Sequence, residues 1–174
     1  MDIYNDIERK AFITAVEAHK DRRYISKDCD YPYMFHLYSV VQILKGEGVM
    51  DKNILCAAWL HDTIEDTDMT YKDVNALFGK EIAEIVYAVT DELGRNRKER
   101  KAKTLPKLID FPEAQIVKLA DVLANVLESI SSKSSHIEMY RKEYPDLRAI
   151  VKDSENETII SLMNKLDLYL LKLP

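Results

Sequence analysis

Apolar residues recur at helical spacing along almost the whole chain, and this period is the feature that most restricts its fold. Ile82, Ile85, Val86 and Val89, for example, fall at i, i+3, i+4 and i+7, which places them on one face of a helix. Strict alternation of apolar and polar residues, which marks a half-buried strand, is scarce, and the 174 residues include only four glycines. We therefore expect an all-α fold, and this length suits one domain, residues 1–174, with a single core.

Capping residues predict where several of these helices begin. The helix that contains the apolar run 54–60 is expected to start after Asp51. Thr70 and Asp73 have the spacing of a capping box, and Gly79 ends the helix that this box would open. Pro112 suits the first turn of a long helix farther along the chain. Local chemistry thus supports the helical pattern.

Other segments interrupt the pattern. Residues 20–30 are expected to form a polar loop, and Pro32 suits the first turn of the helix that follows. The strongly basic segment 95–107 breaks the apolar period. Residues 136–172 carry two further helical patterns, split near Pro145 because proline removes a backbone donor and disturbs a helix interior. We expect these C-terminal helices to pack on the rest of the domain.

Composition excludes several classes of protein. The net charge is −5, whereas a duplex-binding protein usually presents a basic surface, so we expect no nucleic-acid partner. We find no apolar stretch long enough to span a bilayer, and residues 1–6 lack the basic and apolar parts of a signal peptide. The two cysteines form no Cys-x-x-Cys pair, so no zinc ribbon is indicated. These features predict a soluble, cytoplasmic protein without a membrane partner.

Four ionisable side chains are expected to face the interior. His36 lies in register with the apolar residues of its helix, and His61 and Asp62 directly follow the apolar run 54–60. Asp121 lies on the inner face of a later helix. Each residue has an ordinary explanation when taken alone. His36 could be a satisfied core histidine, and Asp62 and Asp121 could form ion pairs or helix caps.

Together the four side chains point to a bound divalent cation, because buried carboxylates without a compensating charge are very costly. Two imidazoles and two carboxylates form a mixed nitrogen and oxygen set, which suits Mn, Fe or Zn better than a metal that prefers thiolates. Four protein ligands on an octahedral metal leave two positions, which water and a phosphate oxygen could share. The pattern therefore predicts a hydrolytic metal site.

Two more carboxylates follow at helical spacing. Glu65 lies one turn after His61, and Asp66 lies one turn after Asp62, so both are expected beside the metal. There they could orient an attacking water and exchange protons with it. The alternative is an ordinary acidic helix end, although the helix dipole disfavours negative charge at a C-terminus.

These stretches resemble the HD-domain phosphohydrolases, and in particular the hydrolase branch of the RelA/SpoT enzymes, which act on the alarmones ppGpp and pppGpp. The resemblance spans most of residues 8–127. Its most specific parts are Pro-Tyr-x-x-His at 32–36, His-Asp-x-x-Glu-Asp at 61–66 and Lys-Leu-Ala-Asp-x-x-x-Asn at 118–125.

The resemblance implies a single HD-domain helical bundle that removes the 3′-pyrophosphate of ppGpp and leaves GDP. The implied cofactor is Mn2+, with another divalent transition metal as the alternative, and the implied partner is a small-molecule nucleotide. The resemblance assigns the metal to His36, His61, Asp62 and Asp121, catalysis to Glu65 and Asp66, and contact with the sugar or base to Asn125.

Substrate contacts are less specified. The run Arg22-Arg23-Tyr24 resembles the place where the family packs a basic pair on the base, and Arg23 and Tyr24 are the candidate contacts, although tyrosines at helix starts are more often packing residues. The basic segment 95–107 could hold phosphate groups or could be a solvated charged loop. Its candidate residues are Arg97, Arg100, Lys101 and Lys103.

The chain departs from the family at Val122, where an arginine or lysine is usual soon after the aspartate of the third stretch. This departure leaves two other functions open. One is a nucleotide phosphatase that acts on a 2′- or 3′-phosphate, NADPH included. The other is a module that binds an alarmone without cleaving it. The sequence leaves the oligomeric state open.

Overall fold

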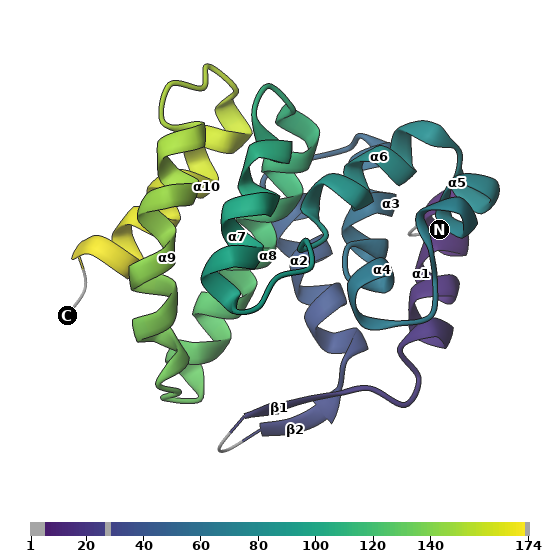
Figure 1. Cartoon of the computed structure of the whole chain (residues 1–174), viewed down its shortest axis with the longest axis horizontal. Helices are drawn as coiled ribbons and strands as arrows, with labels where there is room; N and C mark the ends of the chain where they lie inside the picture. The colour runs from purple at the N-terminus through teal and green to yellow at the C-terminus, as the bar shows by residue number, and fades with distance from the viewer. Residues whose placement is uncertain (1–5, 27–28, 173–174) are drawn as a thin grey trace.

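Helices account for most of the chain (Figure 1). The computed structural model describes residues 6–26 and 29–172, and within these residues no helix is both long and apolar enough to cross a membrane. The α-helices are α1 (Asp6–Ala18), α2 (Met34–Gly46), α3 (Lys52–Leu60), α4 (Thr63–Asp66), α5 (Tyr71–Phe78), α6 (Lys80–Val89), α7 (Arg97–Thr104), α8 (Pro112–Ser131), α9 (His136–Val151) and α10 (Glu157–Asp167). The remaining elements are strands β1 (Arg23–Ser26) and β2 (Cys29–Pro32), a 3-10 turn η1 (Leu105–Leu108) and a π-helical end η2 (Leu168–Lys172).

Two helices form the centre of the fold. α3 packs against α1, α2, α6 and α8, and α8 also packs against α2, α6, α9 and α10. Every residue of α3 from Ile54 to Leu60 is buried, as the uniformly apolar run predicted. Buried apolar side chains form one cluster that extends from Ala11 to Leu170. Polar groups carried by α3 and α8 therefore lie against this core and need partners there.

The predicted start of α3 and the predicted capping box are confirmed. The Asp51 carboxylate accepts hydrogen bonds from the backbone N–H groups of Asn53 (2.7 Å) and Ile54 (3.1 Å) at the start of α3. Thr70 and Asp73 form the reciprocal capping box that opens α5. Gly79 joins α5 to α6 at a φ of 88°, a left-handed conformation that favours glycine.

The prediction of a loop over residues 20–30 is wrong. Strands β1 and β2 pair there as an antiparallel hairpin, in which Tyr24 lies opposite Tyr31 and their rings stack with centroids 5.3 Å apart. Aromatic cross-strand pairs stabilise such ribbons. Pro32 ends β2 and does not open a helix, and α2 begins two residues later, at Met34.

Two further boundaries differ from the prediction. Pro145 lies inside α9, because the buried stripe of Tyr144, Leu147 and Val151 continues across it at i, i+3 and i+7 and outweighs the local penalty of proline. The break comes after Val151, and the Asn156 side chain caps α10. The basic segment is not a loop over its whole length, since it contains α7.

Candidate active site

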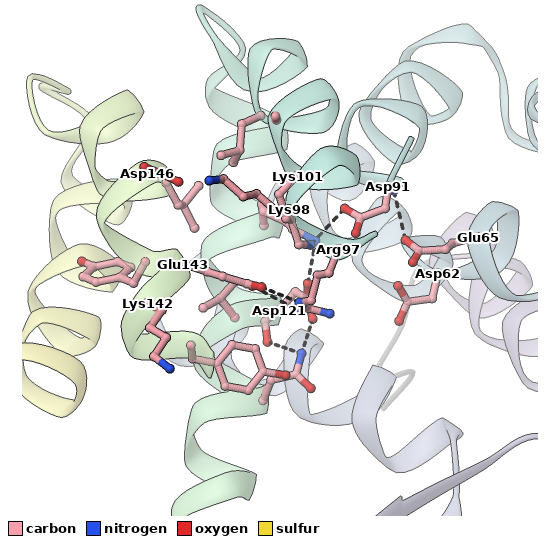
Figure 2. Close-up of a pocket in the computed structure, with 18 of the residues that line it drawn as sticks. Asp62, Glu65, Asp91, Arg97, Lys98, Lys101, Asp121, Lys142, Glu143 and Asp146 are labelled. Carbon is pink, nitrogen blue, oxygen red and sulfur yellow. Dashed lines mark hydrogen bonds and ion pairs between the residues drawn. The ribbon is translucent and has the colours of Figure 1, made fainter. Parts of the chain in front are cut away.

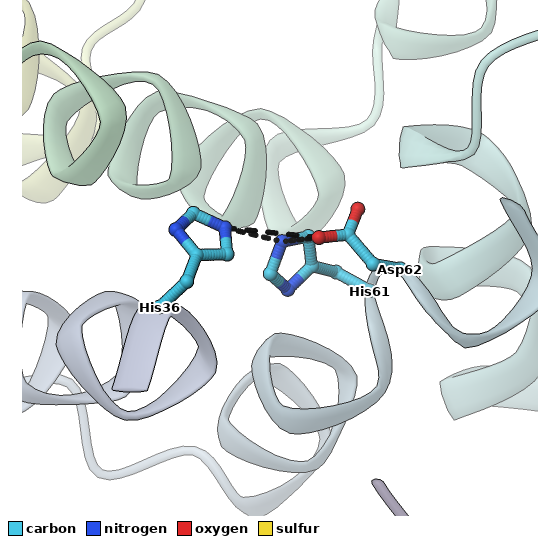
Figure 3. Close-up of side chains that lie close together, drawn as sticks. All are labelled: His36, His61 and Asp62. Carbon is cyan, nitrogen blue, oxygen red and sulfur yellow. Dashed lines mark hydrogen bonds and ion pairs between the residues drawn. The ribbon is translucent and has the colours of Figure 1, made fainter. Parts of the chain in front are cut away.

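Four side chains converge beside the core. The contributing segments are α2 for His36, the turn between α3 and α4 for His61 and Asp62, and α8 for Asp121. The Nε2 atoms of His36 and His61 are 3.3 Å apart, and Asp62 Oδ2 lies 2.9 Å from His61 Nε2 and 3.7 Å from His36 Nε2 (Figure 3). Asp121 Oδ1 lies 3.3 Å from His36 Nε2 and 3.7 Å from His61 Nε2.

These separations suit a shared cation. Ligand atoms about 2.1 Å from one metal are about 3.0 Å apart along an octahedral edge and about 3.4 Å apart along a tetrahedral edge. The five measured separations, 2.9–3.7 Å, bracket both values. His36, His61 and Asp62 together form a group that could hold a metal ion. Asp121 is not part of that group, but its Oδ1 lies within 3.3 Å of His36 Nε2 and 3.7 Å of His61 Nε2.

The electrostatics of the cluster also favour a cation. Burial alone would lower the pKa of His61, but the Asp62 and Asp121 carboxylates outweigh burial and raise that pKa well above its ordinary value. Burial alone would raise the pKa of Asp121, but the Lys118 ammonium and the two imidazoles hold it well below its usual range. The cluster therefore stabilises positive charge at its centre.

Neighbouring groups orient the donor atoms. His61 Nδ1 lies 2.8 Å from the Ala58 carbonyl, so it can donate its proton there and leave Nε2 free. Asp121 Oδ2 is 3.0 Å from Lys118 Nζ, and Asp121 Oδ1 accepts a hydrogen bond of 2.7 Å from Asn125 Nδ2. Metal-binding side chains are commonly fixed by such partners.

A cavity of about 660 Å3 opens beside the cluster. Figure 2 shows Arg97, Lys98 and Lys101 of α7 opposite Lys142, Glu143 and Asp146 of α9, with Asp62 beside Glu65. A volume of this size suits a nucleotide-sized ligand. The charged residues that line it are Arg22, Asp62, Glu65, Asp66, Asp91, Arg97, Lys98, Lys101, Lys118, Asp121, Lys142, Glu143 and Asp146.

Glu65 and Asp66 both line this cavity next to Asp62. Glu65 Oε2 accepts a hydrogen bond of 3.0 Å from the backbone N–H of Asp91, and Asp66 Oδ1 pairs with the Arg22 guanidinium at 2.8 Å. Burial and the nearby Asp62 carboxylate raise the pKa of Asp66 to about 6, although Arg22 opposes the shift. The structure thus brings both predicted acids to the cavity.

The predicted cations of α7 differ in whether they line the cavity and in which acid they contact. Arg97 lines the cavity in a two-point ion pair with Glu143 of α9, at 2.5 and 3.0 Å. Lys101 also lines it and contacts Asp91 at 2.9 Å. Arg100 is 3.8 Å from Glu65. Lys103 is paired with Glu99 at 3.1 Å.

The residues in and beside the hairpin also differ in whether they reach the site. Of the described residues, Arg22 and not Arg23 lines the cavity, and Arg23 pairs with Asp30 at 2.5 Å. The Tyr24 hydroxyl donates to Asn125 Oδ1 at 3.1 Å, and its ring lies 5.8 Å from that of His36. Tyr24 and Asn125 therefore border the candidate metal cluster formed by His36, His61, Asp62 and Asp121.

Several residues of the site were not predicted from the sequence. Lys118 lies inside the stretch 118–125, and this position was the only signal for it. Asp91 lies within residues 8–127, the range of the resemblance, but in none of its three most specific stretches. Tyr33, which belongs to the Pro-Tyr-x-x-His stretch, donates its hydroxyl to Asp62. Lys98 and Lys142 also line the cavity. Lys98 belongs to the basic segment 95–107, whereas nothing in the sequence context of Lys142 distinguishes it from a surface lysine.

Comparisons with known proteins show the family of the chain. The family model described as HD domain matches residues 11–151. The guanosine-3′,5′-bis(diphosphate) 3′-pyrophosphohydrolase MESH1 of Drosophila melanogaster is 33% identical over 154 residues, 86% of each chain. The MESH1 of Danio rerio is 38% identical over 115 residues, which are 64% of this chain and 63% of the relative. This chain thus aligns with less than two thirds of that second relative.

A solved structure shows the same fold. It concerns a metazoan ortholog of SpoT that hydrolyzes ppGpp, and it matches with a TM-score of 0.83 over 98% of this chain and 100% of the other, at 24% identity. At that identity the likeness supports the fold alone. The match to the HD-domain model and the similarity to the fruit-fly relative show that the chain belongs to the HD-domain family, in the branch of the MESH1 hydrolases.

Proposed function

We propose that the chain is a metal-dependent guanosine-3′,5′-bis(diphosphate) 3′-pyrophosphohydrolase, which converts ppGpp and water into GDP and pyrophosphate. The observation that carries the proposal is the convergence of two imidazoles and two carboxylates beside a cavity whose lining includes both carboxylates, Glu65, Asp66 and several cations. The activity named for the MESH1 relatives supports it.

The proposed cofactor is Mn2+, held by His36, His61, Asp62 and Asp121. Their mixed nitrogen and oxygen donors suit this ion, and iron or zinc would be the alternatives. A bound divalent cation polarises a phosphoryl oxygen and makes water a stronger nucleophile near neutral pH.

Glu65 and Asp66 are the proposed proton carriers. Water attacks the phosphorus bonded to the 3′-oxygen, a new phosphorus–oxygen bond forms, and the bond to the 3′-oxygen breaks. Asp66 or Glu65 accepts the proton from water, and a proton passes to the departing 3′-oxygen, which completes GDP. Both carboxylates line the cavity beside Asp62 and are within one helical turn of the metal cluster.

The cations of the cavity are proposed to hold the phosphate groups of ppGpp and pppGpp. Arg97 and Lys101 are the candidates from α7, and Lys98 lies beside them. Arginine offers two parallel donors to a phosphate group, as it does here to the Glu143 carboxylate. Tyr24 and Asn125, which contact each other beside the cluster, are proposed to face the nucleoside.

A product assay tests the function. Purified protein with Mn2+ is incubated with ppGpp, pppGpp and NADPH in parallel, and the released nucleotide, phosphate and pyrophosphate are identified. We expect GDP and pyrophosphate from ppGpp. Intact ppGpp, beside a control enzyme that cleaves it, contradicts the proposal.

The same assay separates the alternatives. Release of inorganic phosphate from NADPH, with ppGpp left intact, would assign a nucleotide phosphatase. Val122, which lines the cavity where the family usually has a basic residue, is the observation that favours this second candidate. Tight binding of ppGpp without any product would assign a binding module.

A further inference from the structure

Tyr33 contacts the metal cluster directly. It lies between β2 and α2 and is half-buried, and its hydroxyl donates a hydrogen bond of 2.6 Å to Asp62 Oδ2. This oxygen is the one that lies 2.9 Å from His61 Nε2 and 3.7 Å from His36 Nε2. The hydroxyl therefore holds the carboxylate oxygen that faces the other donor atoms.

The ring of Tyr33 is itself held in place. The ring of His19 stacks on it with centroids 5.1 Å apart and an interplanar angle of 18°. The Arg22 guanidinium lies 5.3 Å from the ring centroid, and Arg22 also pairs with Asp66 at 2.8 Å. A ring packed in this way presents its hydroxyl from a fixed position, so little entropy is lost when the hydrogen bond forms.

Asp62 needs this support because of its place in the chain. It lies in the turn between α3 and α4, and its carboxylate makes no capping hydrogen bond to α4. Asp121, by contrast, is carried by the long helix α8 and contacts both Lys118 and Asn125. Tyr33 thus holds the Asp62 carboxylate in place, as Lys118 and Asn125 hold the Asp121 carboxylate.

We propose that Tyr33 is a positioning residue that fixes Asp62 Oδ2 for metal binding. This inference rests on the proposed metal site but not on the identity of the substrate. Without the hydroxyl, the Asp62 carboxylate can rotate away from the two imidazoles. Binding of the ion must then also order this side chain, which costs conformational entropy. Loss of such an outer partner typically weakens metal binding by about 10–100-fold.

The test is Tyr33→Phe, which removes the hydroxyl and keeps the ring that His19 and Arg22 contact. The Kd for Mn2+ is measured by equilibrium dialysis without nucleotide. We expect a Kd about 10–100-fold higher than in the unaltered protein. In the ppGpp assay, half-activation should need more Mn2+ by the same factor, while kcat at saturating Mn2+ stays within a few-fold.

Tyr144→Phe is the matched control. The Tyr144 hydroxyl donates to the Asp167 carboxylate at the same 2.6 Å, but Asp167 belongs to α10 and not to the metal cluster. This variant should keep the Mn2+ Kd of the unaltered protein. Circular dichroism checks that both variants are folded.

Three results would overturn the proposal. The first is an unchanged Mn2+ Kd in a folded Tyr33→Phe variant. The second is equal weakening in Tyr144→Phe, since the effect would then follow from the loss of any buried tyrosine hydroxyl. The third is a lack of Mn2+ binding by the unaltered protein, which removes the metal site as well. A protein that binds Mn2+ but leaves ppGpp intact would refute the proposed function alone, because dialysis measures the role of Tyr33 independently of substrate.

Discussion

At the scale of single residues, the side chains of the candidate metal cluster are buried, so their negative charges need compensating positive charges. Each carboxylate lies 2.9–3.7 Å from the two imidazoles, and the buried Lys118 ammonium lies 3.0 Å from Asp121. Lys118 compensates part of the negative charge of Asp121, and a divalent cation would compensate the remainder. Removal of one donor should therefore affect the cation more than the fold.

His61→Ala should lose both metal and turnover. Removal of one of four donors leaves a weakly held ion, so the Mn2+ Kd should rise by more than the roughly 10–100-fold typical of outer partners. Equilibrium dialysis and the ppGpp assay measure the two effects. His136→Ala, which removes an exposed histidine of α9, is the control and should change neither. Stoichiometric Mn2+ with full activity in His61→Ala would exclude His61 from the site.

Glu65→Gln separates catalysis from metal binding. Glutamine keeps the size and one acceptor oxygen for the Asp91 N–H, but it cannot carry a proton. We expect unchanged Mn2+ content and a kcat that falls by about 10²–10⁴, the usual contribution of a positioned acid or base. The exposed Glu84→Gln is the control. Loss of metal would make Glu65 a ligand, and an unchanged kcat would move the proton transfer to Asp66.

Helical register predicted which residues meet, but not which of two neighbours turns inward. His36 lies where its apolar neighbours placed it, because α2 is regular and buries one face. Asp121 ends a stretch of α8, residues 114–121, in which every residue is buried. Arg22 and Arg23 are different, since they lie at the start of a hairpin that the sequence pattern did not reveal. There Arg22 reaches Asp66, and Arg23 pairs with Asp30.

At the scale of elements, α3 carries the site at one end and its cap at the other. His61 follows the last residue of α3, and Asp51 caps the first turn. A change at the cap should therefore alter stability without touching the donor atoms.

Asp51→Ala should lower the free energy of unfolding by about 0.5–2 kcal/mol, because two backbone N–H groups of α3 lose their acceptor. Urea denaturation measures this change, and dialysis should show unaltered Mn2+ stoichiometry. Asp153→Ala, at an exposed position between α9 and α10, is the control and should stay within about 0.5 kcal/mol. Equal stability of the Asp51 and Asp153 variants would show that the cap is not what stabilises α3.

Tertiary packing explains the elements that the sequence did not predict. α9 runs through Pro145 because Tyr144, Leu147 and Val151 are buried on both sides of it. The hairpin forms around the stacked rings of Tyr24 and Tyr31. Its two strands have only eight residues together and carry no long alternating pattern. Local signals were sufficient only where a cap or a glycine fixed the boundary, as at Asp51 and Gly79.

At the scale of the whole molecule, the cavity depends on contacts between distant segments. α7 and α9 face each other through Arg97 and Glu143, which are 46 residues apart. No spacing in the sequence predicts a contact between residues so far apart. The pattern therefore indicated the basic residues but not their acidic partners. The proposal that residues 1–174 form one HD-type domain is supported by the single buried cluster that reaches from Ala11 to Leu170.

Metal binding should stabilise the whole fold, because the ion binds donor atoms that only folding brings together. At a free Mn2+ concentration 100-fold above Kd the gain is about 2.7 kcal/mol. For a chain of this length the melting temperature should rise by about 5–11 °C relative to protein in chelator. Differential scanning calorimetry measures the shift. An equal shift in His61→Ala would mean that Mn2+ stabilises the protein at another place.

The central claim is that water cleaves ppGpp at the phosphorus bonded to its 3′-oxygen. The most direct test is hydrolysis of ppGpp by the Mn2+-loaded protein in 18O-labelled water, followed by mass spectrometry of both products. The account predicts GDP without label and pyrophosphate with one 18O atom, because the new bond forms at phosphorus and the 3′-oxygen stays on the ribose. Label in GDP, release of inorganic phosphate in place of pyrophosphate, or ppGpp that stays intact would contradict it.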